Sequence, residues 1–117
     1  MALGVPGITT HILDISQGRP AGGVQVALDI REPEGWREIR RSLTDADGRV
    51  RQLLPEELPL RAGTYRLTFD VGAWFQAQGI ASFYPEASIV FLVRDPDQHH
   101  HVPLLLSPFG YSTYRGS

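Results

Sequence analysis

Nine prolines and twelve glycines are distributed along the 117 residues and divide the chain into short segments. Proline and glycine interrupt regular secondary structure, so each segment has room only for a short strand or a turn of helix. Several segments alternate apolar and polar side chains, which is the period of a strand with one buried face. The spacing therefore predicts an all-β sandwich or barrel.

The clearest alternation lies at 63–71, where Tyr65, Leu67, Phe69 and Val71 share one face. About eight strands are expected in all: 8–15, 24–31, 36–43, 50–54, 63–71, 89–93 and the two arms of a hairpin around 107–110. One short helix is expected at 73–78, because good helix formers stand there between Gly72 and Gly79.

For two of these strands the pattern also predicts which side chains share a face or are covered. In 36–43, alternation places Trp36, Glu38 and Arg40 on one face and Arg37, Ile39 and Arg41 on the other. The run 89–93 is continuously apolar, which is consistent with a strand that is covered on both faces.

Length and composition limit the class of protein. The 117 residues predict a single domain over 1–117, and 1–7 are expected to form a flexible N-terminal segment. The net charge of -2 argues against a large nucleic-acid interface, and the absence of cysteine excludes disulfides and a thiol nucleophile. No basic leader and no membrane-spanning apolar run is visible, so a cytoplasmic protein is expected.

Four polar features are candidates for a functional site: His11, the run 99–101, Arg49 and the final segment 114–117. Taken singly, each has an ordinary structural explanation, such as a surface histidine, a solvated arginine or a charged edge strand. In an extended strand His99 and His101 share a face while His100 points the opposite way. Adjacent strand positions cannot converge on one ion, so no metal site is expected.

Taken together, these features lie in five motifs that resemble one family. The motifs are Thr-Thr-His-Ile-Leu-Asp at 9–14, Gly-Arg-Pro-Ala at 18–21, Asp-Gly-Arg at 47–49, His-Val-Pro-Leu-Leu-Leu-Ser-Pro at 101–108 and Tyr-Ser-Thr-Tyr-Arg-Gly-Ser at 111–117. From about residue 8 to 117 the chain resembles the 5-hydroxyisourate hydrolases, the transthyretin-related enzymes of urate breakdown. The terminal Tyr-Arg-Gly-Ser distinguishes these hydrolases from the hormone-carrying transthyretins.

The resemblance implies a transthyretin-like, two-sheet β-sandwich with one short helix. It also implies a homotetramer, a dimer of dimers, with active sites at the dimer–dimer interface and with no cofactor or metal. The catalytic residues carried over are His11, Arg49, His101 and Ser117. The substrate-binding residues carried over are His11, Arg49, Tyr114, Arg115 and Ser117. One departure is visible, because the family commonly has tyrosine where this chain has His100.

The chemistry of these side chains suits the hydrolysis of a cyclic amide. Histidine can take a proton from water near neutral pH and return it to the leaving nitrogen. Arginine is a fixed cation with a planar set of donors, suited to a carbonyl-rich ring and to a developing oxyanion. A serine hydroxyl can position substrate or water. The sequence does not identify which histidine is the base.

Three other functions remain open at this level. A small-molecule carrier would use the same channel but has no need of paired proton-transfer groups. A structural β-module would place the histidines on its surface without a chemical role. A metal-dependent hydrolase would lose its activity on chelation.

Overall fold

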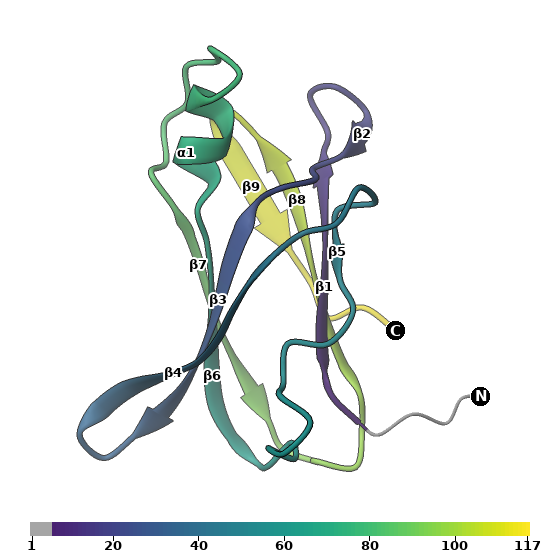
Figure 1. Ribbon diagram of the computed structural model, residues 1–117, viewed down its shortest axis with the longest axis vertical. Coiled ribbons are helices and arrows are strands. Elements are labelled where there is room, and N and C mark those ends of the chain that lie inside the picture. The colour runs from purple at the N-terminus through teal and green to yellow at the C-terminus, as the bar shows by residue number, and fades with distance from the viewer. Residues whose placement is uncertain (1–5) are drawn as a thin grey trace.

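A computed structural model describes residues 6–117, and these form two β-sheets packed face to face (Figure 1). Residues 1–5 of the segment expected to be flexible lie outside the described residues. The first sheet has the order β2-β1-β8-β9, with β5 paired to β1, and the second has the order β4-β3-β6-β7. The predicted two-sheet sandwich is confirmed.

The element boundaries follow the alternating segments closely. The first sheet consists of β1 (Ile8–Asp14), β2 (Arg19–Pro20), β5 (Arg49–Val50), β8 (His100–Ser107) and β9 (Gly110–Thr113). The second consists of β3 (Gln25–Glu32), β4 (Gly35–Leu43), β6 (Gly63–Phe69) and β7 (Ala87–Val93). The helix α1 (Val71–Gln76) follows β6.

Side chains of alternate positions fill the space between the two sheets. In β6, Tyr65, Leu67 and Phe69 are buried, as their period predicts. Ile12 of β1 and Leu104 of β8 are fully buried in the same core from the other sheet. Burying each side chain of this size contributes about 1.5–3 kcal/mol, so the core fixes which face of each strand points outward.

The face assignment predicted for β4 is wrong for Arg40 and Arg41, because the strand contains a bulge at Ile39, which itself packs against the core. Leu28 of β3 is opposite Arg40, and the next residue of β3, Asp29, is opposite Glu38, so Ile39 has no partner. The extra residue moves Arg40 to the other face from Glu38. Arg41 therefore joins Glu38, and their side chains form an ion pair with an N–O distance of 2.9 Å.

The prediction that 89–93 is covered on both faces is also wrong for the single chain. Val90 and Leu92 are 55% and 52% exposed. They lie opposite Arg66 and Thr64 of β6, on the outer face of the second sheet, where the described part of the chain adds no further layer. Because β7 is also an edge strand, it presents apolar side chains and unpaired backbone groups together.

Other boundaries also shifted: the strand predicted at 63–71 ends at Phe69, and the helix ends at Gln76 instead of residue 78. The helix begins two residues earlier than predicted, because Gly72 lies inside its first turn and donates its N–H to the carbonyl of Pro85 (3.0 Å). The strand predicted at 50–54 ends at Val50. Beyond it the side-chain oxygen of Gln52 accepts backbone N–H groups of Ile8 (3.3 Å) and Leu54 (3.0 Å) in place of strand pairing.

His100 is the residue of the histidine run that points into the molecule. It is 4% exposed, and its Nδ1 has no hydrogen-bond partner among the described residues. Burial lowers its pKa from the ordinary value of 6.5, and the charge of Arg115 acts in the same direction. The carbonyl of Gln98 opposes this shift. The imidazole is therefore neutral in the folded chain at neutral pH.

We expect His100 to make stability depend on pH. Its unfolded form binds a proton near pH 6.5, while the folded form binds one only at lower pH. The free energy of unfolding should therefore fall as the pH drops below 6.5. Urea denaturation of the wild type and of His100→Tyr at pH 7.5 and 5.5 measures this. Identical pH dependence in both proteins would contradict the prediction, since the other histidines are present in each.

Candidate functional site

The turn before β5 places Arg49 beside His11. Gly48 has a φ of +77°, and a Cβ at this position would collide with the carbonyl of Ile12. The carbonyl of Gly48 accepts the N–H of Ile12 at 2.8 Å, which fastens the turn to β1. In the antiparallel pairing that follows, Arg49 is directly opposite His11. Directly opposed residues point to the same face of a sheet, so the guanidinium and the imidazole are neighbours.

The parallel pairing of β1 with β8 brings His101 to the same face. Thr9 is opposite His101 in the register, and Thr9 and His11 are two positions apart on β1. The hydroxyl of Thr9 lies 2.8 Å from Nδ1 of His101 and 2.9 Å from Nε2 of His99. His99 and His101 thus share a face and His100 points away from it, as the sequence predicted.

The end of the chain lies against His101. The N–H of Gly116 donates to the carbonyl of His101 at 2.8 Å, and the two residues form an isolated β-bridge. A Cβ at Gly116 would stand 2.5 Å from Cδ2 of the His101 ring. Only glycine lets the backbone lie this close to the imidazole, and this contact carries Ser117 to the same region.

These elements surround a shallow hollow of about 340 Å³. It is lined by Thr9, Thr10, Arg49, Val50, Arg51, His99, His101 and Ser117. Three of the four residues predicted to be catalytic, Arg49, His101 and Ser117, therefore line one hollow. The fourth, His11, is opposite Arg49 on the same sheet face but is not among the lining residues of the single chain.

Tyr114 and Arg115 lie elsewhere in the single chain. Both line a separate, mostly apolar hollow of about 270 Å³ beside β7. Nη2 of Arg115 donates to the carbonyl of His99 at 3.1 Å and to Oε1 of Gln98 at 3.3 Å. The guanidinium of Arg115 therefore holds the loop that leads into β8, and the hollow that it lines shares His101 with the candidate site.

Burial and neighbouring positive charge keep both imidazoles of the site neutral near pH 7. Burial is the main cause that lowers the pKa of His101, and the charges of Arg49, His11 and His99 add to it. Burial also lowers the pKa of His11, again with Arg49. The carbonyl of Asp47 and the carboxylates of Asp47 and Asp45 partly oppose this shift. Neutral imidazole is the form that can accept a proton.

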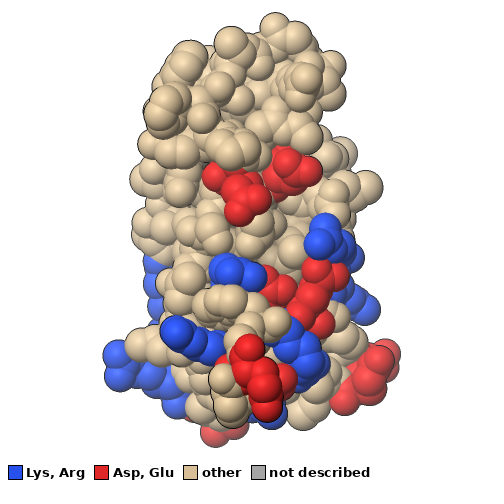
Figure 2. Space-filling view, turned by 90° about the vertical axis from the view of Figure 1, so that its left-hand side faces the viewer, with Lys and Arg blue, Asp and Glu red and all other residues tan. Residues whose placement is uncertain are grey.

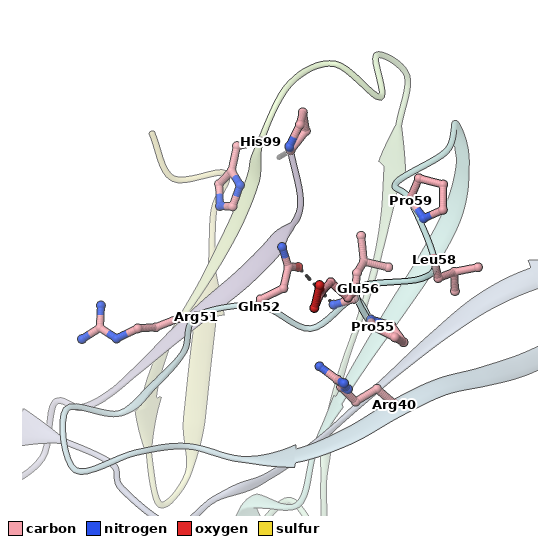
Figure 3. A pocket seen from close by; sticks show the side chains of 10 residues that line it. Arg40, Arg51, Gln52, Pro55, Glu56, Leu58, Pro59 and His99 are labelled. Atoms are coloured by element: carbon pink, nitrogen blue, oxygen red, sulfur yellow. Dashed lines mark hydrogen bonds between the residues drawn. The ribbon is translucent and has the colours of Figure 1, made fainter. Parts of the chain in front are cut away.

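A larger hollow of about 790 Å³ adjoins the candidate site and shares Arg51 and His99 with it. Figure 3 shows Arg40 extending from β4 toward the loop that holds Pro55 and Glu56, while His99 stands at the far side. Thr9 and Arg51 were not identified as site residues from the sequence, and His99 was considered only as part of the histidine run. Thr9 could have been found, because it lies two strand positions from His11.

Two further findings concern the described residues as a whole. Within residues 6–117, no three side chains of His, Asp or Glu are grouped so that they could hold a metal ion. In the same range, no helix has both the length and the apolar character needed to span a membrane.

Comparison with known proteins identifies relatives of this chain. The model of the HIUase/Transthyretin family matches residues 8–116. A 5-hydroxyisourate hydrolase of Caulobacter vibrioides is 48% identical over 95% of this chain and 98% of the relative. The structure of Klebsiella pneumoniae 5-hydroxyisourate hydrolase is similar with a TM-score of 0.82 and 44% identity, over 94% of this chain and 98% of the other. Sea bream transthyretin in complex with thyroxine has a TM-score of 0.84 and 36% identity, over 93% of both chains.

Replacing Gly116 with alanine should push the His101 ring away from the end of the chain. Because burial is the main cause of the lowered pKa of His101, displacement toward solvent should raise that pKa toward 6.5. NMR titration of the His101 ring protons measures the shift. Gly110→Ala is the matched control, since its added Cβ meets only Oγ of Ser107, at 3.8 Å. Equal His101 titration in both variants would contradict the assigned contact.

Proposed function

The chain belongs to the HIUase/Transthyretin family and is an enzyme, and on that premise we propose that it hydrolyses 5-hydroxyisourate in purine degradation. One observation carries the proposal: Arg49, His101 and Ser117, from three distant parts of the chain, line one hollow, with His11 opposite Arg49. A cationic donor, two neutral imidazoles and a hydroxyl can supply the proton transfer and oxyanion stabilisation that water attack on a cyclic amide needs.

The proposed reaction adds one water across a ring C–N bond. The water oxygen bonds to a ring carbonyl carbon, and the carbonyl oxygen becomes an oxyanion. The C–N bond then breaks, and the leaving nitrogen takes up the proton that the water released to the base. The carboxylic acid that forms loses its remaining proton to solvent and becomes a carboxylate. The product is 2-oxo-4-hydroxy-4-carboxy-5-ureidoimidazoline, and no oxidant or reductant takes part.

The residues divide this work according to their chemistry. His11 and His101 handle the water and its proton, because both are neutral near pH 7 through their lowered pKa values. Arg49 stabilises the oxyanion as a fixed cation. Ser117 positions substrate or water by hydrogen bonding. Tyr114 and Arg115 would bind substrate only if assembly brings them to the hollow of another copy. No metal ion is needed for these steps.

Assembly into a homotetramer, a dimer of dimers with sites at the dimer–dimer interface, completes the proposal. Such an assembly needs two separate contact surfaces on each chain. One candidate surface is the exposed apolar face of β7, with Val90 and Leu92. The other is formed by Phe83 and Phe109, which are 69% and 68% exposed and lie close together, since the N–H of Phe83 donates to the carbonyl of Pro108.

The charge distribution is compatible with such contacts. Figure 2 shows that charged residues gather at the lower end of one side of the molecule, where the β3–β4 hairpin of Figure 1 lies. The upper part of this side, around α1, carries no charge in that view. Surfaces without charge lose less solvation on association.

The cytoplasmic location expected from the sequence stays a prediction, which fractionation of the source cells tests.

A ligand-carrying function is the second candidate, because the chain is also similar to a transthyretin that was solved with thyroxine. A carrier would leave the spontaneous decay of 5-hydroxyisourate unchanged.

Replacing His101 with asparagine should lower turnover of 5-hydroxyisourate by roughly a hundredfold or more, the usual scale for losing a proton-transfer group. The measurement is the spectroscopic decay of freshly generated substrate, with and without chelator. His100→Tyr is the control and should keep nearly full turnover, because residue 100 points away from the site. Near-normal turnover in His101→Asn would refute its role, and loss of wild-type activity on chelation would refute the metal-free mechanism.

Sedimentation of the wild type should give the mass of four chains. Phe109→Asp or Val90→Asp places a charge in one of the two contact surfaces and should reduce the mass to that of two chains. A monomeric wild type would contradict the proposed assembly.

A further inference from the structure

The hydroxyl of Thr9 joins two histidines of the site. Its Oγ1 lies 2.9 Å from Nε2 of His99 and 2.8 Å from Nδ1 of His101. A hydroxyl has one proton to donate and can accept from a second partner, so the two contacts can have opposite directions. The direction of these two hydrogen bonds depends on what the second nitrogen of each imidazole ring is bonded to.

The backbone of Gly7 fixes the direction at His99. Its N–H donates to Nδ1 of His99 at 3.3 Å, so this nitrogen carries no proton. In a neutral imidazole the proton then lies on Nε2, which donates to the hydroxyl of Thr9. The Thr9 proton is thereby directed to Nδ1 of His101. The proton of the neutral His101 ring is left on Nε2.

We propose that Thr9 and His99 are positioning residues that hold His101 in the tautomer protonated on Nε2. The mechanistic part of this inference rests on the proposed function. In that tautomer Nε2–H is a hydrogen-bond donor, so His101 and Arg49 together stabilise the oxyanion. The base is then His11, which takes the proton from water and returns it to the leaving nitrogen. Of the two histidines proposed to handle the water and its proton, His11 then transfers the proton and His101 donates the hydrogen bond that stabilises charge.

The charged and titratable groups around His101 are consistent with a neutral ring. Arg49 from β5, His11 from β1 and His99 from the segment before β8 all lower its pKa, together with burial. The backbone carbonyl of Thr9 is the opposing group, because it favours a proton on the ring. Removing the Thr9 hydroxyl removes the group that contacts Nδ1, so the preference for a proton on Nε2 should be lost.

The test is the tautomer of His101, read from long-range proton–nitrogen NMR spectra of the ¹⁵N-labelled full chain at pH 8. The wild type should show the proton on Nε2. Thr9→Val, which keeps the shape but removes the hydroxyl, should increase the Nδ1-protonated form, and Thr9→Ser should restore the wild-type spectrum. Thr68→Val on β6 is the matched control and should leave the spectrum unchanged. Thermal melting of each variant separates a loss of fold from a change of tautomer.

Kinetics of the same variants tests the consequence for catalysis. Thr9→Val should lower kcat by about tenfold with little change in KM, because one hydrogen bond that orients the imidazole is removed and a loss of this size is usual for a single hydrogen bond. Thr9→Ser should recover most of this loss.

The outcomes separate the two proposals. A wild-type His101 protonated on Nδ1, or a folded Thr9→Val protein with an unchanged tautomer, would overturn the inference. A changed tautomer with wild-type kcat would overturn the catalytic consequence. A wild type with no effect on 5-hydroxyisourate, but with a tautomer that depends on Thr9, would overturn only the proposed function.

Discussion

The parallel pairing of β1 with β8 is the contact on which the candidate site depends. The two strands are 92 positions apart at Thr9 and His101, and seven residues of each are in register. Closing a loop of this length costs conformational entropy before any contact forms. The core side of the same strands offsets that cost, because Ile12 and Leu104 are opposite each other and fully buried. The outward side is then free to carry threonine and histidine in place of apolar residues.

The three consecutive histidines have different chemical properties because their positions in the fold differ. His99 is exposed and bonded to a backbone amide, whereas His100 is buried and its Nδ1 has no hydrogen-bond partner within residues 6–117. His101 is half-buried beside Arg49, and its neighbours lower its pKa. Strand alternation alone separates His100 from the other two. The difference between His99 and His101 comes from the distant segments that contact each ring.

Much of the fold could be predicted from the sequence, because a period of two identifies half-buried strands such as β6 without further information. The bulge at Ile39 could not, since it depends on which residues of β3 pair with β4. The exposure of Val90 could not be predicted either, because an apolar run does not indicate which layers cover the strand. For the site, convergence of Arg49, His101 and Ser117 came from family resemblance rather than from spacing. The direction of the hydrogen bonds at Thr9 depends on the backbone of Gly7, which no side-chain pattern reveals.

The order of strands in the first sheet has a consequence for synthesis. β1 is made first, but its long partner, β8, is made after nearly the whole chain, and β5 and β2 pair with only two residues each. A nascent chain on the ribosome therefore carries β1 with most of one edge unpaired until residues 100–107 have emerged. The first sheet therefore cannot be completed until β8 has been synthesised. Until then the unpaired edge of β1 is open to pairing with other chains, which is a general route to misassembly during synthesis.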